Sequence, residues 1–174
     1  EAAGIPAADI EAVIERELAR AVPMIAHGAR RLKGTRVAIF QDTPTAAALA
    51  AFLHELDCEV PLVVLTDGAE ADPDAILATA ARLGATFPTP PRVYADLSRD
   101  GGLARFRELV EIEPIPVVIG SSVQKSALAE GQAAVIELGY PSVFKHALYP
   151  TPWLGYNGAL ALVQRLVDAR QYAF

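Results

Sequence analysis

Cysteine is nearly absent from this sequence, since Cys58 is the only one among 174 residues. A disulfide bond within the chain is therefore impossible, and a reducing, cytoplasmic setting is expected. No apolar run reaches the roughly 18 residues that a membrane-spanning helix needs. No basic segment followed by an apolar one marks a leader at the N-terminus either. The sequence predicts a soluble chain without a disulfide framework.

Positive charge is also in deficit. Fifteen Lys and Arg residues stand against 21 Asp and Glu, which gives a net charge of −6 and a pI near 5.0. This balance argues against a general nucleic-acid or anionic-membrane surface, because phosphates would be repelled. Hydrophobic residues make up 52% of the chain, enough for one sizeable core, and the length favours a single domain. Because the sequence begins at Glu1 and not at a methionine, we expect a fragment, a processed chain or a trimmed one.

The familiar signatures of nucleotide, hydrolase and metal sites are missing. Residues 41–44, which follow the first expected strand, lack the Gly-x-Gly-x-x-Gly fingerprint, and no P-loop occurs, so bound NAD is not expected. No serine lies in a Gly-x-Ser-x-Gly elbow. The three histidines are far apart and form no HxxxH or HExxH pattern, and Cys58 is more typical of a small core residue than of a ligand. We therefore expect no catalytic residue and no metal site within this chain.

Short apolar segments alternate with amphipathic ones along the chain. Strands are expected at 37–40, 60–65, 92–95, 115–119 and 133–137, and helices at 7–32, 44–57, 73–84, 101–112, 125–131 and 156–170. This alternation predicts an α/β fold with a doubly wound, mainly parallel, five-stranded Rossmann-like sheet and helices on both faces. We expect a lead-in helical segment at 1–32, kinked or divided at Pro23, and a Rossmann-like domain at 33–174. Pro61 and Pro116 suit strand starts or edges better than central positions.

Ligands of open α/β sheets collect at the carboxyl ends of the strands, and two of these ends carry short polar motifs. Asp42 or Thr43 is expected to cap the following helix. Gly120-Ser121-Ser122 opens another helix, where Ser121 and Ser122 could bind an anion or could cap the helix.

The third carboxyl end is the most distinctive. Residues 138–158 concentrate aromatic residues, glycines and a histidine in a loop that leads into the last helix. A long, patterned loop in this position is more often functional than a bare connection. His146 either contacts a cofactor, partner or substrate, or holds the loop together. Trp153 and Tyr156 are further candidates, because aromatic anchors are common in interfaces and pockets, and Asn157 is a candidate as part of the same motif.

Four blocks carry a resemblance to a known family. They are Ala29-Arg-Arg-Leu-Lys-Gly34, the strand and helix from Thr35 to Val60, Pro116-Val-Val-Ile-Gly-Ser-Ser122, and Leu138-Gly-Tyr-Pro-Ser142 through His146 to Pro152-Trp-Leu-Gly-Tyr-Asn-Gly158. Together they resemble subunits of the nitrogenase component 1 type, which include nitrogenases of nitrogen fixation, cofactor-maturation scaffolds and reductases of chlorophyll biosynthesis. The fourth block is the most specific, and its spacing to the last helix is most similar to the beta-type subunits. The resemblance covers about residues 1–170 and corresponds to the final third or so of a family member.

The resemblance implies an electron-transfer enzyme. In the family, an ATP-dependent iron–sulfur reductase protein docks on an alpha–beta pair and delivers electrons through a cluster to a metal centre or a bound tetrapyrrole. The cluster cysteines lie in N-terminal domains, and Cys58 corresponds to a structural position. The expectation is therefore the C-terminal domain of a beta-type subunit, which contributes to the subunit interface and to a cofactor or substrate pocket. The iron–sulfur or metal cluster belongs to the full complex, with none bound by this fragment alone.

Two alternatives remain open at this stage. The first is a cofactor-maturation scaffold of the same family, which the same motifs would fit. The second is a free-standing Rossmann-like binding or signalling module. Asp42 superficially resembles the phosphorylated aspartate of a receiver domain, but the acidic pair is absent and Lys145 is several residues out of place. The enzyme reading also predicts an exposed apolar patch on the isolated chain.

Overall fold

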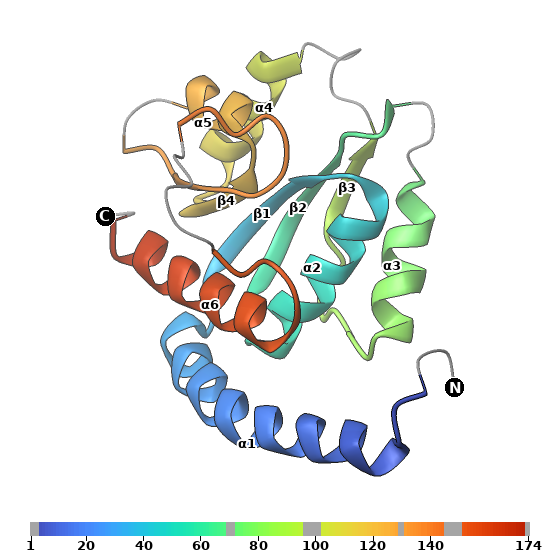
Figure 1. Cartoon of the computed structure of the whole chain (residues 1–174). Helices are drawn as coiled ribbons and strands as arrows, with labels where there is room; N and C mark the ends of the chain where they lie inside the picture. The colour runs from blue at the N-terminus through green and yellow to red at the C-terminus, as the bar shows by residue number, and fades with distance from the viewer. Residues whose placement is uncertain (1–3, 69–71, 96–101, 129–130, 145–150, 173–174) are drawn as a thin grey trace.

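The computed structural model describes residues 4–68, 72–95, 102–128, 131–144 and 151–172 (Figure 1). The elements within these ranges are α1 (Ala7–Leu32), β1 (Arg36–Gln41), α2 (Thr43–Glu55), β2 (Glu59–Leu65), α3 (Pro73–Arg82), β3 (Arg92–Ala95), α4 (Gly102–Ile112), β4 (Val117–Gly120), α5 (Ser122–Ala127), β5 (Ala134–Glu137) and α6 (Gly155–Tyr172). Each expected strand and helix is present. No helix of this described part is long and apolar enough to span a bilayer.

The sheet has the strand order β3-β2-β1-β4-β5, and every neighbouring pair is parallel. The chain therefore winds outward from β1 to β3, crosses to β4 and winds outward again to β5. This doubly wound arrangement confirms the predicted fold class. Its reversal point lies between β1 and β4, where open α/β sheets place their ligands.

Both faces of the sheet are covered. Val37 and Ile39 of β1 pack with α2 and α6 on one side, whereas Ala38 between them packs with Phe106 of α4 on the other. All three β1 side chains are fully buried. Continuous apolar runs are thus explained by burial on two faces, as in parallel sheets generally.

Pro61 lies inside β2, an internal strand, without disrupting it. Arg36 pairs with Glu59 and Ala38 with Leu62, so β2 carries one residue more than β1 over this stretch. The resulting bulge accommodates a residue that has no N–H to donate to the ladder. Pro116 immediately precedes β4, which agrees with its expected place at a strand start.

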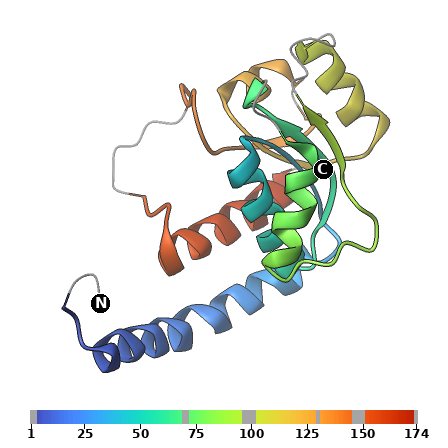
Figure 2. The same cartoon turned by 90° about the vertical axis from the view of Figure 1, so that its right-hand side faces the viewer.

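Helix α1 is one helix from Ala7 to Leu32 that contains Pro23, so of the two outcomes expected there, a kink or a division, the division is wrong. Figure 1 shows it as a single curved helix. Its C-terminal half packs against α6, where Gly28 lets the two helices approach closely. Its N-terminal half extends away from the sheet (Figure 2). The division into a lead-in segment at 1–32 and a domain at 33–174 remains a prediction.

Helix α5 begins at Ser122, three residues before the expected start. Ser121 is its N-cap: the Ser121 hydroxyl accepts a hydrogen bond from Val123 N, and Gln124 Oε1 accepts one from Ser121 N at 2.7 Å. This capping box fixes the start of the helix. The helix then ends at Ala127, so the predicted span of 125–131 is displaced toward the C-terminus.

Candidate functional site

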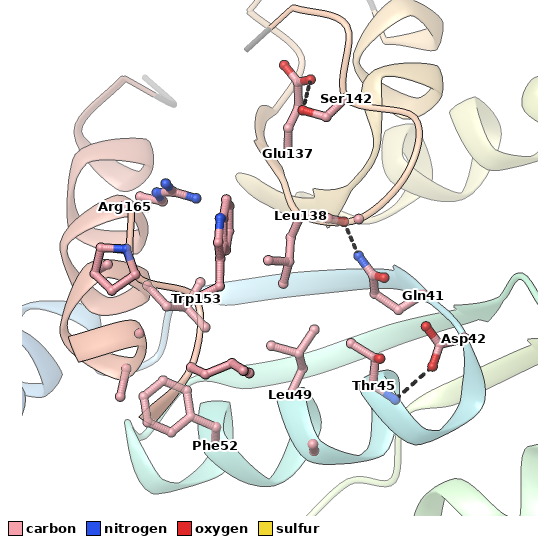
Figure 3. A pocket seen from close by; sticks show the side chains of 18 of the residues that line it. Gln41, Asp42, Thr45, Leu49, Phe52, Glu137, Leu138, Ser142, Trp153 and Arg165 are labelled. Atoms are coloured by element: carbon pink, nitrogen blue, oxygen red, sulfur yellow. Dashed lines mark hydrogen bonds between the residues drawn. The ribbon is translucent and has the colours of Figure 1, made fainter. Parts of the chain in front are cut away.

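A pocket of about 880 Å³ opens between α2 and α6, at the carboxyl ends of β1 and β5 (Figure 3). Apolar side chains form most of its wall, and polar groups lie near the ends of the strands and on α6. The wall includes Leu49, Phe52, Leu138, Trp153, Ala159 and Leu162, and the polar groups include Gln41, Asp42, Glu137, Ser142 and Arg165. A concave apolar site with a few polar groups is the usual form of a small-molecule pocket.

Trp153 and Arg165 meet on the α6 side of this pocket. The Arg165 guanidinium carbon lies 4.3 Å from the centroid of the Trp153 ring, a cation–π contact. Burial lowers the pKa of Arg165 below its ordinary value. Gly158 lies beside the Trp153 backbone, at a place where a Cβ atom would stand 2.5 Å from the Trp153 carbonyl carbon. Because residue 158, in the first turn of α6, is a glycine, the backbone of Trp153 can pack directly against the helix.

Glu137, the last residue of β5, is the centre of a hydrogen-bond network. Its carboxylate accepts hydrogen bonds from Ser122 Oγ at 2.6 Å, Ser142 Oγ at 3.2 Å and Lys125 Nζ at 3.2 Å. Burial alone would raise the pKa of Glu137, but these hydrogen bonds and the Lys125 charge outweigh it and hold the pKa below its ordinary value. Ser122 Oγ also accepts a hydrogen bond from Val143 N at 2.6 Å. The network therefore joins α5, β5 and the loop that follows.

The end of β1 supplies the opposite side of the pocket. Gln41 donates a hydrogen bond to the carbonyl of Leu138, which links the carboxyl ends of β1 and β5. Asp42 is the N-cap of α2, and its carboxylate accepts from Thr45 N at 3.0 Å. The expected capping role of Asp42 is therefore confirmed. Thr43 N in turn donates to Asp67 Oδ2 at 2.8 Å.

The predicted site residues fall in different places. Trp153 lines the pocket, whereas Ser121 caps α5 and Ser122 supports Glu137. Asn157 faces α1, where its side-chain oxygen accepts from Arg20 at 2.6 Å. Tyr156 is half-buried and is not among the residues that line this pocket. His146 and Lys145 lie outside the described residues.

Glu137 and Arg165 were not singled out from the sequence. Helical spacing could have indicated Arg165. Gly158, Leu162 and Arg165 follow the spacing i, i+4, i+7 and therefore share one face of α6. Glu137 gave no such signal, since it ends a short apolar strand and its partners come from two other segments.

Apolar side chains of the described residues are exposed at several places on the surface, two of which concern the site. Along α1, from Ile10 to Val22, they are 42–52% exposed and comprise Ile10, Val13, Ile14, Leu18 and Val22. We call this set the α1 stripe. In the segment between β5 and α6, Leu154 is 89% exposed, Tyr140 95% and Phe144 52%. The exposed apolar patch expected from the sequence is therefore present.

The donor chemistry of the described residues does not fit a metal cluster. No group of three or more His, Cys, Asp and Glu side chains with metal-binding geometry occurs among them. Cys58 is buried near the amino end of the sheet, where burial, with a smaller contribution from the Asp57 charge, raises the pKa of its thiol to about 12. A thiol so strongly held in its protonated form is a poor ligand, because metals bind the thiolate.

Comparison with known proteins gives one consistent family. The family described as nitrogenase component 1 type oxidoreductase matches residues 1–171. The nitrogenase molybdenum-iron protein beta chain of Bradyrhizobium diazoefficiens is 30% identical over 160 residues, which cover 92% of this chain and 30% of that one. The corresponding chain of Azotobacter vinelandii is 28% identical and is covered to 31%. This chain thus spans about 30% of the length of these relatives.

A solved structure of nitrogenase Cp1 at pH 6.5 has the same fold. It superimposes with a TM-score of 0.74 and 23% sequence identity, over 96% of this chain and 34% of the solved one. At this level of identity the likeness concerns the fold.

Proposed function

Because the chain belongs to the nitrogenase component 1 type oxidoreductase family, we propose that it is the C-terminal domain of a beta-type subunit in an ATP-driven electron-transfer complex. Its relatives are beta chains of molybdenum-iron proteins, of which it spans about 30%. The match over residues 1–171 is the observation that carries the proposal. In this role the domain contributes to the subunit interface and to a pocket for a cofactor or substrate.

The exposed apolar surface supports the interface part of the proposal. Isolated soluble chains rarely expose contiguous apolar patches of this kind without a binding role. Ile10 and Ile14 lie on the same helical face as Gly28, which α6 covers farther along. We propose that the α1 stripe is covered in the same way by another part of the complex, with an alpha-type subunit as partner.

Electron transfer is proposed to use clusters held elsewhere in the complex. The described residues of this chain bring together no group of three or more side chains that could hold such a cluster. An ATP-dependent iron–sulfur reductase protein is the proposed electron donor, and the cytoplasm is the proposed location.

Purification from the source organism tests this function. The chromosomal gene is tagged, the protein is purified without oxygen, and its partners are identified by mass spectrometry. We expect an alpha-type member of the same family in stoichiometric amount, and the iron–sulfur reductase protein in the presence of ATP. A chain that purifies alone, or with unrelated proteins only, would contradict the proposal.

A matched pair of α1 variants sharpens this experiment. Ile14→Gln with Leu18→Gln alters the α1 stripe, and we expect the alpha-type partner to be lost. Glu11→Gln with Glu15→Gln makes the same number of changes at exposed acidic positions of the same helix and should leave the partner in place. Equal recovery of the partner with both variants would rule out the stripe as the interface.

A further inference from the structure

Arg165 is a half-buried cation whose charge nothing in the described structure balances. It projects from α6 between the buried residues Val163 and Leu166. Its contact with the Trp153 ring is a cation–π interaction, which uses the face of the guanidinium and none of its N–H groups. Among the described residues, no oxygen accepts a hydrogen bond from Arg165, and no carboxylate pairs with it. A cation held partly out of water without an acceptor costs free energy that a bound anion would recover.

The two carboxylates that line the same pocket are already engaged. Glu137 is bound by two serines and Lys125, and Asp42 accepts from the backbone of α2 (Figure 3). Figure 3 shows Arg165 beside the indole of Trp153, with Glu137 paired to Ser142 on another side of the pocket. Neither carboxylate is therefore an internal partner that could turn to Arg165 without leaving donors unpaired.

The rest of the wall is apolar and partly flat. Phe52 of α2 and Trp153 supply aromatic surfaces, and Leu49, Leu138 and Leu162 surround them. An inorganic anion would leave these side chains without a partner, and a neutral apolar molecule would leave Arg165 unpaired. The described lining contains neither cysteine nor histidine, so a metal centre has no soft ligand there.

We propose that this pocket binds a flat, largely apolar organic anion, whose acid group pairs with Arg165 and whose body lies against Trp153. A volume of about 880 Å³ lies within the range of small-molecule sites and admits a molecule of several fused or linked rings. Arg165 can hold a carboxylate through two parallel N–H groups, which would orient the ligand as well as bind it. This inference rests on the pocket part of the proposed function and names its ligand class.

Trp153 provides a direct readout, because it is the only tryptophan of the chain. The probes are 9-anthracenecarboxylate and its neutral analogue 9-anthracenemethanol, which have the same flat body and differ in charge. Each is titrated into the 174-residue chain while energy transfer from Trp153 is measured. We expect saturable quenching by both probes, with the carboxylate bound at least tenfold more tightly than the alcohol.

Variants at Arg165 isolate the charge. Arg165→Met should weaken carboxylate binding at least tenfold, to the level of the alcohol, and leave alcohol binding unchanged. Arg165→Lys should retain part of the preference, since it keeps the charge without the paired N–H groups. Arg170→Met, on the same helix but outside the pocket lining, is the matched control and should bind like the unaltered chain. Circular dichroism confirms that each variant is folded, and Arg165→Gln replaces Arg165→Met if that protein does not fold.

Three results would overturn the inference. They are absence of saturable quenching by the carboxylate, equal affinity for the two probes, and an unchanged preference in Arg165→Met. The second result would mean that the charge of Arg165 does not contribute to ligand binding. Because the titration needs no partner subunit, its failure is distinguishable from failure of the purification experiment, and either proposal can fall alone.

Discussion

Gly158 and the backbone of Trp153 lie so close together that no side chain fits between them. A Cβ atom at position 158 would stand 2.5 Å from the carbonyl carbon of Trp153 and 2.6 Å from its oxygen. Both atoms belong to the backbone, so neither can yield by a change of rotamer. Because residue 158 has no side chain, the segment before α6 can pack directly against the helix. This packing places the indole of Trp153 on the pocket wall.

Gly158→Ala should displace this segment. We expect a loss of about 1–3 kcal/mol in the free energy of unfolding, the usual cost of overpacking a closed contact. The emission of Trp153 should also shift to longer wavelength as the indole becomes more exposed. Urea denaturation, followed by circular dichroism and by fluorescence, measures both effects. Gln171→Ala, an exposed position near the end of the same helix, should change stability by less than about 0.5 kcal/mol; equal effects of the two variants would count against this account.

The contact between α1 and α6 depends on a second glycine. A Cβ atom at Gly28 would stand 2.2 Å from Cγ1 of Val163, which is only 5% exposed. Gly28→Ala should therefore separate the two helices and lower the free energy of unfolding by about 1–3 kcal/mol, as overpacking does. Thermal denaturation monitored at 222 nm checks the prediction.

A double-mutant cycle tests whether Val163 is the obstacle. Val163→Ala alone should be destabilising, because it removes buried methyl groups. Combined with Gly28→Ala, it opens room for the new methyl group, so the double variant should lose less stability than the sum of the two single variants. The coupling should be about 0.5–3 kcal/mol, as for residues in contact. Additive losses would show that the clash lies elsewhere.

The order of strands and helices, and with it the fold class, could be predicted from sequence patterns alone. Burial on two faces makes a strand such as β1 apolar at every position, and this run is visible without a structure. Helix α5 begins at Ser122 and not at residue 125, because the capping box of Ser121 and Gln124 sets its start; capping was one of the two roles expected for Ser121. Helix α1 was expected to kink or divide at Pro23, and it does not divide, because the helix is continuous on both sides of Pro23. Local sequence patterns thus predict whether a segment is a helix or a strand better than they predict its first and last residues.

The site was harder to predict than the fold, because its members meet only through tertiary structure. Trp153 was named from its loop, and it does line the pocket. Asn157, from the same motif, turns to Arg20 of α1, 137 residues away in sequence. The motif does not reveal this, since successive helical residues point 100° apart and only some of them face the pocket. Arg165 lies two turns beyond Gly158 in α6, outside the loop whose motif indicated a site.

Protonation of Glu137 should weaken the fold in acid. The carboxylate is buried in a network of three donors, and its pKa in the folded chain lies below the ordinary value. A carboxyl group with a depressed pKa contributes stability above its unfolded pKa, near 4.3, and loses it as pH falls through the folded value. Glu137→Gln should therefore be less stable than the unaltered chain by about 1–3 kcal/mol at pH 7, and this difference should shrink below about pH 4.

Urea denaturation of both proteins between pH 7 and pH 3 measures this dependence. Glu108→Gln is the control, because Glu108 is exposed and forms only a surface ion pair with Arg105. Its effect should stay below about 1 kcal/mol throughout. A difference between Glu137→Gln and the unaltered chain that remains constant with pH would mean that the carboxylate charge does not stabilise the fold.

Cys58 should be almost inert toward thiol reagents in the folded chain. Burial raises the pKa of its thiol to about 12, and its Sγ lies 3.7 Å from the carbonyl oxygen of Leu32. At pH 8 the reactive thiolate is therefore scarce, and the surrounding side chains also block the reagent. We expect the reaction with 5,5′-dithiobis(2-nitrobenzoate) to be at least about 100-fold slower than in 6 M urea, on the basis of the thiolate fraction alone.

The same raised pKa makes a prediction about alkaline stability. A group whose pKa is higher in the folded than in the unfolded chain contributes stability below its unfolded pKa, near 8.5, and loses it as pH rises toward the folded value. Cys58→Ala removes this contribution, so the unaltered chain should lose more stability than the variant between pH 8.5 and pH 11. Rapid modification of Cys58 at pH 8 without denaturant would require that the amino end of the sheet opens. In that case the slope of stability against pH should be the same for the two proteins.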